Sequence, residues 1–168
     1  MRTILTFGLA LFLTIAFQSN ADAQISDEGD FTIGAGIGYG SAVGGWGGGE
    51  PGIGINGYYG ITEDIRAGLG FIYYLVGESD FSSTEINIDG HYIFKNEDDI
   101  VLYGLAGISY GTYSWNTGFG SISASTTGFN LGGGVEYDLG SIALYAEPKF
   151  TVGGFGQFNI SGGARLRF

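Results

Sequence analysis

The last twelve residues of the chain alternate strictly between apolar and polar positions. Positions 158, 160, 162, 164, 166 and 168 carry Phe, Ile, Gly, Ala, Leu and Phe, whereas positions 157 to 167 in between carry Gln, Asn, Ser, Gly, Arg and Arg. A period of two places successive side chains on opposite faces of an extended strand. The segment therefore predicts a β-strand with one apolar and one polar face, which ends on the apolar Phe168.

Seven earlier segments alternate in the same way. They run over about 31–40, 52–61, 66–75, 84–94, 100–110, 127–137 and 142–152. The connections 62–64, 95–99 and 138–141 are short, 151–156 is intermediate, and 41–51, 76–83 and 111–125 are longer. Alternating short and long connections are typical of an up-and-down barrel with short periplasmic turns and longer external loops. We therefore predict an all-β fold, an eight-stranded antiparallel transmembrane β-barrel over residues 31–168.

Two positions complicate this pattern. The 100–110 segment is apolar on both phases, and we assign Leu102, Ala106, Ile108 and Tyr110 to one face because residues 107–111 repeat the pattern of residues 36–40. Pro148 lies inside the 142–152 strand, where it cannot donate a backbone hydrogen bond. We expect a local bulge or a gap in the ladder at this proline.

The polar phase indicates which face points inward. Glycine occupies most of this phase in several strands, and glycine weakens a strand without favouring a solvated face. A crowded interior explains it better, because the bulky Tyr58, Tyr74, Tyr103 and Tyr145 lie on the same phase and need room. The apolar phase then faces outward to lipid, and a barrel of eight strands is just wide enough for side chains to fill it. We expect no continuous water path.

Charged residues share this inward phase. The cations are Arg66, Lys149, Arg165 and Arg167, and the acids are Glu85, Asp89, Glu136 and Glu147. Buried charges require partners. If the 138–141 turn sets the hairpin register, Glu136 lies opposite Ala143, and Ala143 lies opposite Arg165. We therefore predict an ion pair between Glu136 and Arg165, with Arg66 and Arg167 as nearby alternatives.

The N-terminus has the features of a secretory signal. Arg2 precedes an apolar stretch from Ile4 to Phe17, and Ala21, Asp22 and Ala23 form a small-x-small cleavage pattern. A membrane anchor helix is the alternative, but the apolar run is shorter than the roughly 20 residues that span a bilayer. We expect residues 1–23 to be cleaved, leaving 24–30 as a short tail before the barrel.

Composition excludes several classes of function. A formal charge of −11 argues against a nucleic-acid partner. An aromatic content of 15% argues against a disordered chain. The absence of cysteine excludes a disulfide framework and a lipid-anchored Cys after the signal. No later stretch is apolar enough for a spanning helix, so a membrane location requires a closed barrel that satisfies its own backbone.

Four features together resemble the OmpA/OmpX-like family of small outer-membrane β-barrels. They are the terminal Phe168, the glycine-rich opening at 34–40, the stretch 131–138 and the stretch 145–150. The resemblance covers nearly all of 31–168. It implies an outer-membrane location and contact of the last strand, through Phe168, with the barrel-assembly machinery. It is nearly silent on function, because this family includes structural anchors, adhesins and proteins without an assigned activity.

Candidate sites have simpler structural interpretations. His91 is the only histidine, and without a nearby nucleophile or orienting group it is better explained by an interior polar network than by catalysis. The acidic turn 96–99 lacks cation-loop spacing, and the glycine runs at 34–40 and 131–134 do not open helices, which a phosphate loop requires. Trp46 and Trp115 fall in predicted loops, where they serve either a surface partner or the membrane interface.

The sequence thus favours an integral outer-membrane barrel with a structural, membrane-integrity or surface-contact role. We expect no pore, enzymatic activity, cofactor, metal or catalytic residue. One alternative is a soluble secreted barrel with an apolar, ligand-binding interior. Another is an outer-membrane lipid-modifying enzyme, for which the sequence offers only His91.

Overall fold

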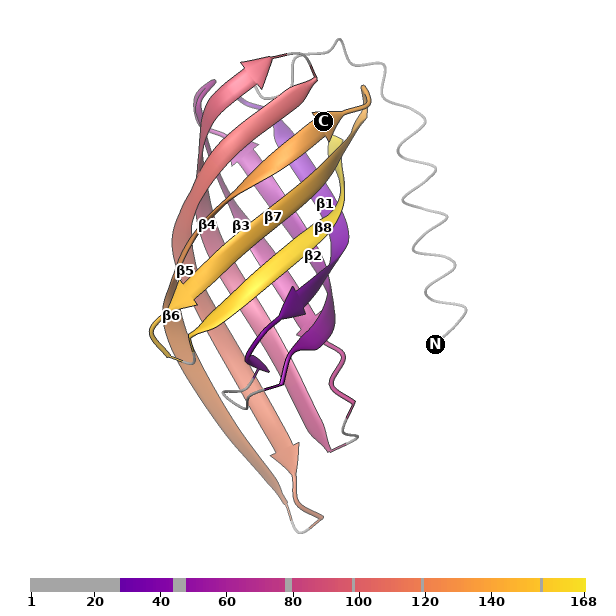
Figure 1. The fold of residues 1–168 in the computed structure, drawn as a ribbon, viewed down its shortest axis with the longest axis vertical. Coiled ribbons are helices and arrows are strands. Elements are labelled where there is room, and N and C mark those ends of the chain that lie inside the picture. Colours follow the sequence, from indigo (N-terminus) through magenta and orange to yellow (C-terminus); the bar gives the residue numbers. More distant parts are fainter. Residues whose placement is uncertain (1–27, 44–47, 78–79, 98, 119, 155) are drawn as a thin grey trace.

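The computed structural model describes residues 28–43, 48–77, 80–97, 99–118, 120–154 and 156–168. Eight antiparallel strands close into one barrel in chain order, as the sequence predicts (Figure 1). They are β1 (Phe31–Gly40), β2 (Glu50–Gly60), β3 (Ile65–Tyr74), β4 (Phe81–Glu97), β5 (Ile100–Asn116), β6 (Ser121–Asp138), β7 (Ile142–Val152) and β8 (Gln157–Arg167). The predicted signal segment 1–23 lies outside the described residues.

The barrel has two distinct ends. The turn end, at the top of Figure 1, holds the connections at 61–64, 98–99 and 139–141 and the residues that close the barrel. There the amide of Phe168 donates to the carbonyl of Phe31 (2.9 Å), and the amide of Phe31 donates to the carbonyl of Phe168 (3.3 Å). At the loop end β1 is connected to β2, β3 to β4, β5 to β6 and β7 to β8.

The segment 111–125 is not the long loop that the sequence predicts. β5 and β6 stay paired from Gly111 opposite Thr126 out to Asn116 opposite Ser121, and this hairpin projects beyond the other strands at the loop end (Figure 1). Thr, Tyr, Trp and Ile favour extended backbone and offset the glycine and serine of this segment. The hairpin closes where the amide of Thr117 donates to the carbonyl of Gly120 (2.8 Å).

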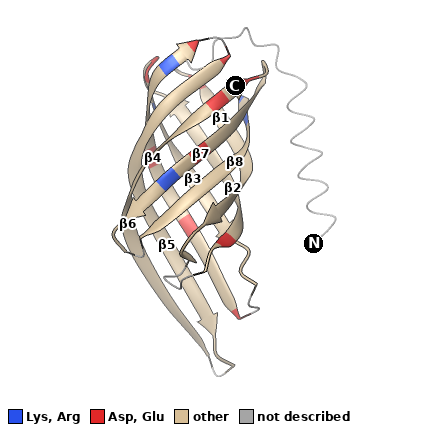
Figure 2. Ribbon diagram, in the orientation of Figure 1, with Lys and Arg blue, Asp and Glu red and all other residues tan. Residues whose placement is uncertain are grey.

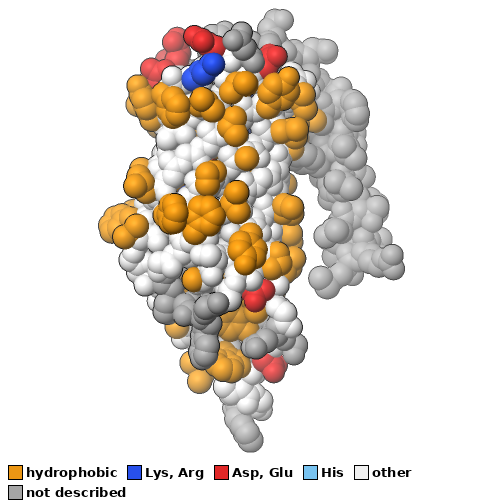
Figure 3. Space-filling model, in the orientation of Figure 1, with side chains coloured by type: hydrophobic (Ala, Val, Ile, Leu, Met, Phe, Trp, Pro, Cys, Tyr) orange, Lys and Arg blue, Asp and Glu red, His pale blue; other side chains and the backbone are white. Residues whose placement is uncertain are grey.

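The apolar phase faces outward around the barrel. Ile37 is 72% exposed and Phe129 is 69% exposed, whereas Arg165 and Tyr103 are each 1% exposed. On the face shown in Figure 3, hydrophobic side chains are spread over the barrel wall, and charged side chains lie near its ends. The assignment of Ile108 and Tyr110 to the outer face of β5 is confirmed, since both are exposed. A soluble barrel with an apolar interior does not fit this arrangement. No helix among the described residues is long and apolar enough to cross a membrane.

Glycines make room for tyrosines in the lumen, as the sequence predicts. Tyr58 lies opposite Gly68 on the neighbouring strand, and Tyr103 lies opposite Gly134. A Cβ atom added to either glycine would overlap the tyrosine ring that faces it. The excess of glycine on the inward phase is therefore a packing requirement of a narrow lumen.

Two irregularities interrupt the ladders. Between β6 and β7 the described pairing stops after Gly132 opposite Lys149 and resumes at Val135 opposite Ala146 without a change of register. This gap includes Pro148, which confirms the predicted gap in the ladder. The β-bulge lies elsewhere, between Ile93 and Lys95 of β4.

Candidate functional site

A buried charge cluster lies in the lumen, in the part nearer the turn end. It joins Arg66 of β3, Glu136 of β6 and Arg165 of β8, and each residue is at most 2% exposed. Nη1 of Arg66 donates to Oε2 of Glu136 (3.1 Å), and Nη2 of Arg66 and Nη1 of Arg165 both contact Oε1 of the same carboxylate. The predicted pair of Glu136 with Arg165 is confirmed, and Arg66 is a second partner rather than an alternative.

The register that led to this pair is partly wrong. Ala143 lies opposite Arg165 as predicted, but Glu136 lies opposite Tyr145, and Asp138 takes the place opposite Ala143. The β6–β7 hairpin turns at residues 140 and 141, where the amide of Leu139 donates to the carbonyl of Ile142 (2.8 Å). Turning there, rather than over 138–141, shifts the register by two residues and leaves every side chain on its predicted face.

Aromatic rings surround the cluster. The imidazole of His91 lies between the rings of Tyr58 and Tyr103, with centroid distances of 4.3 Å to each. Arg165 sits over the ring of Tyr145 (4.0 Å) and Arg66 over the ring of Tyr103 (4.8 Å). A guanidinium over an aromatic face gains electrostatic stabilisation, and the gain is larger when both are removed from water.

His91 belongs to this network. Nε of Arg66 donates to Nδ1 of His91 (3.0 Å), so the imidazole accepts at that nitrogen and is neutral. Its Nε2 lies 3.8 Å from Oε2 of Glu147. The ring is 1% exposed. This position fits the interior-network interpretation that the sequence favoured over a catalytic base.

Glu147 of β7 extends the network toward the loop end. Its Oε2 accepts hydrogen bonds from Nη2 of Arg165 (3.0 Å) and from the hydroxyl of Tyr103 (2.7 Å). Arg165 therefore neutralises two carboxylates, Glu136 and Glu147, whereas the only carboxylate paired with Arg66 among the described residues is Glu136.

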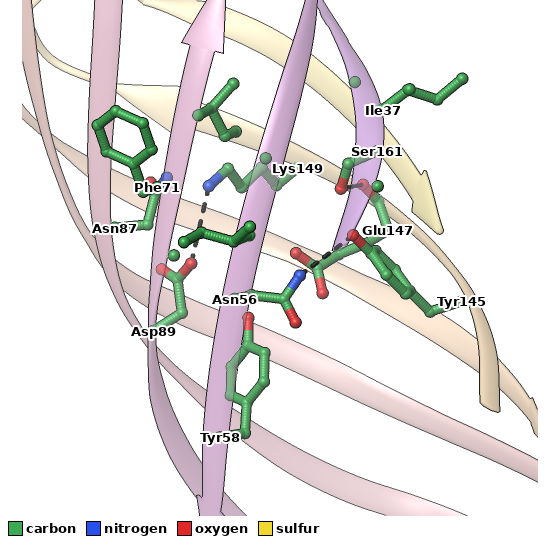
Figure 4. A pocket seen from close by; sticks show the side chains of 16 residues that line it. Ile37, Asn56, Tyr58, Phe71, Asn87, Asp89, Tyr145, Glu147, Lys149 and Ser161 are labelled. Carbon is green, nitrogen blue, oxygen red and sulfur yellow. Dashed lines mark hydrogen bonds and ion pairs between the residues drawn. The ribbon is translucent and has the colours of Figure 1, made fainter. Parts of the chain in front are cut away.

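A second group of charges lies nearer the loop end. Nζ of Lys149 is 3.5 Å from Oε1 of Glu85 and 3.7 Å from Oδ2 of Asp89. Beside them is a cavity of about 40 Å³, into which the side chains of Lys149, Asp89 and Glu147 point from β4 and β7, opposite the glycine-rich strands β1 and β2 (Figure 4). This volume holds a few water molecules.

A third ion pair lies at the turn end. Nη1 of Arg167 donates to Oδ2 of Asp138 (3.2 Å). The sequence reasoning missed Asp138 because it placed this residue in the turn. Asp138 lies two residues after Glu136, so the alternation of β6 also places its side chain inward, and this pattern identifies it. Figure 2 shows these charges distributed along the strands rather than gathered at one face of the ribbon.

The remaining sequence candidates lie apart from this network. Asn96 and Glu97 are exposed at the end of β4 rather than in a turn, and Asp99 is exposed in the turn that follows. The glycine runs at 34–40 and 131–134 form parts of β1 and β6. Trp115 lies in strand β5 rather than in a loop, and Trp46 is outside the described residues. The described residues contain no group of three or more His, Cys, Asp and Glu side chains that could hold a metal ion.

Comparisons with known proteins show the fold. No family model and no curated protein matches the chain. The N-terminal β-barrel domain of Pseudomonas aeruginosa OprF is 17% identical with a TM-score of 0.68, over 84% of this chain and 98% of that one. Neisserial surface protein A is 21% identical with a TM-score of 0.68, over 84% and 100%. Ail, the attachment invasion locus protein of Yersinia pestis, is 20% identical with a TM-score of 0.63, over 84% and 99%.

These neighbours belong to one structural class. Ail is an outer membrane protein, as is OprG of Pseudomonas aeruginosa, which also has a TM-score of 0.68 to this chain. The chain thus has the fold of the small outer-membrane β-barrels, with an apolar exterior and a polar, filled lumen.

Proposed function

We propose that the protein is an integral outer-membrane barrel that supports the envelope or presents its loop end to surface partners. One observation carries the proposal. A closed wall with an apolar exterior surrounds a lumen filled by paired charges and tyrosines. Such a molecule fits a rigid membrane anchor better than a pore, because its interior is occupied by side chains.

The sequence ends add support for this location. Residues 1–23 have the pattern of a secretory signal. Phe168 closes the apolar phase of β8 and is 54% exposed, so its ring is available to the assembly machinery that the family resemblance implies. We propose that Phe168 contacts this machinery during assembly.

A surface-contact role is supported by the projecting β5–β6 hairpin. Long extensions beyond the membrane wall place residues where partners can reach them. One structural neighbour, Ail, is an attachment invasion locus protein. Ail has also been solved with a heparin analogue, sucrose octasulfate. The loop-end segments of this chain contain no Lys or Arg, so we do not extend polyanion binding to it.

Catalysis is the weaker hypothesis. His91 is buried, stacked between two tyrosines and already hydrogen-bonded to Arg66. A general base must reach the proton that it abstracts, and this imidazole has no open route to a lipid substrate. We therefore assign His91 a structural role.

Membrane fractionation tests the proposal. The protein is expected in the outer-membrane fraction after a carbonate wash, without residues 1–23. Its folded form is expected to resist SDS and to migrate differently after boiling. Recovery in the soluble periplasmic fraction, or release by salt or carbonate, would contradict the membrane assignment.

A further inference from the structure

The sheet formed by β4, β5 and β6 reverses its polarity at the loop end. Within the barrel wall, β5 points Ser109 inward and Tyr110 outward. In the projecting part, the inward phase continues as Tyr113 and Trp115, while Ser114 occupies the outward phase. An outward face is apolar where it meets lipid and polar where it meets water. The reversal therefore marks the end of the apolar surroundings and leaves an aromatic face above the mouth of the lumen.

Trp115 of this aromatic face lines a groove at the loop end. Phe81 and Trp115 lie opposite each other in the β4–β5 pairing, and Val43 and Val76 supply the aliphatic lining. Glu50 is the only charged residue among its described lining residues. The groove has a volume of about 390 Å³, within the range of small-molecule sites. Trp115 is 45% exposed, so its ring is accessible to a ligand.

The negative charge of the loop end favours a positively charged ligand. The segments 41–50, 75–81, 111–125 and 153–156 contain no Lys, Arg or His, but they contain Glu50, Glu78 and Asp80. A surface of one sign attracts ligands of the opposite sign and repels those of its own. Aromatic faces add to this preference, since indole and phenyl rings attract ammonium groups. Binding of anions is disfavoured, and a neutral apolar molecule would make no ionic contact with the carboxylate of Glu50.

We infer that the groove binds a small organic cation, an ammonium group on a short aliphatic stem. The stem packs against Val43 and Val76, and the ammonium lies between the carboxylate of Glu50 and the ring of Trp115. This inference refines the proposed surface-contact role. It rests on that role in one respect, namely that the ligand reaches the groove from outside the cell. Binding by purified protein tests the groove separately, whatever the fractionation result.

Calorimetric titration of the barrel in zwitterionic nanodiscs tests this inference. The probes are hexyltrimethylammonium, the neutral 1-hexanol and the anionic hexanoate, with empty nanodiscs as the control for partitioning. We expect saturable binding of one hexyltrimethylammonium per barrel, weaker binding of hexanol and none of hexanoate. Equal affinity for the cation and the alcohol, or identical heats with empty nanodiscs, would overturn the proposal.

Variants locate the binding site. Glu50→Gln is expected to weaken cation binding about fivefold and to leave hexanol unchanged. Trp115→Leu keeps an apolar side chain but removes the aromatic face, and should weaken cation binding roughly 2- to 30-fold. Glu63→Gln makes the same charge change at the turn end and should have no effect. The gel shift on boiling verifies that each variant is folded. Unchanged affinity in both groove variants would refute the site.

Discussion

Removing the charge of Glu136 should destabilise the barrel strongly, because this carboxylate joins two buried guanidinium groups. Glu136→Gln keeps the size of the side chain. In the variant, Arg165 retains the carboxylate of Glu147 (3.0 Å), but Arg66 retains no carboxylate partner among the described residues and keeps only uncharged contacts such as Nδ1 of His91 (3.0 Å) and the ring of Tyr103. Removing one partner of a buried pair costs about 3–5 kcal/mol. We expect a loss in this range, arising mainly at Arg66.

Double-mutant cycles distinguish the two arginines. Arg66→Gln leaves Glu136 paired with Arg165, and the double variant Arg66→Gln/Glu136→Gln leaves the Arg165–Glu147 pair intact. This double variant should therefore cost much less than the sum of the single variants. Arg165→Gln also deprives Glu147 of its guanidinium partner. The coupling energy between Glu136 and Arg66 should consequently exceed that between Glu136 and Arg165.

Urea unfolding in lipid vesicles, followed by tryptophan fluorescence and by the gel shift, measures these free energies. Glu63→Gln, an exposed carboxylate in the 61–64 turn, serves as the control and should change stability by less than about 0.5 kcal/mol. Additivity of Glu136→Gln and Arg66→Gln within about 0.5 kcal/mol would refute the shared-carboxylate geometry. So would equal coupling to both arginines.

Three further outcomes follow from the filled lumen and the closing strand. Gly68→Ala should cost about 1–3 kcal/mol in the same unfolding assay, because its Cβ would overlap the ring of Tyr58, whereas Gly104→Ala, with open space around its Cβ, should be nearly neutral. Planar-bilayer recordings should show no stable openings, and reproducible nanosiemens channels would contradict the packing of the lumen. Deleting Phe168 should lower the amount of barrel in the outer membrane but leave refolding in detergent largely intact; normal cellular levels would remove its assembly role.

The sequence predicts the barrel and the facing of its strands because one physical constraint acts along the whole wall. Lipid outside and a crowded polar lumen inside impose a period of two on every strand. This constraint also resolves β5, where Tyr103 faces inward and Ile108 outward although both phases are apolar. It ends where the wall ends. Beyond Gly111 the inward phase becomes apolar and the outward phase polar, so Trp115 and Ile122 do not follow the alternation of the wall. The sequence of the paired hairpin therefore resembles that of a loop.

Register is harder to predict than facing. The β6–β7 turn is centred one residue later than the sequence predicts, so the residue opposite Glu136 is Tyr145 and not Ala143. A shift of two residues preserves the face of every side chain. The side chains of Glu136 and Arg165 are long enough to meet across that difference. The ion pair could therefore be predicted from the phase of the charges, although its exact register could not.

The buried charges also account for the character of the two exposed ends. Of the five Lys and Arg residues beyond position 23, four lie in the lumen, namely Arg66, Lys149, Arg165 and Arg167. The fifth, Lys95, lies at the turn end. A narrow lumen that contains carboxylates needs these cations as partners, since an unpaired buried charge is costly. The charged residues of the loop-end segments are therefore all acidic, and one of them, Glu50, lines the groove together with Phe81 and Trp115. Its preference for cationic ligands thus follows from the same arrangement that fills the lumen and stabilises the barrel.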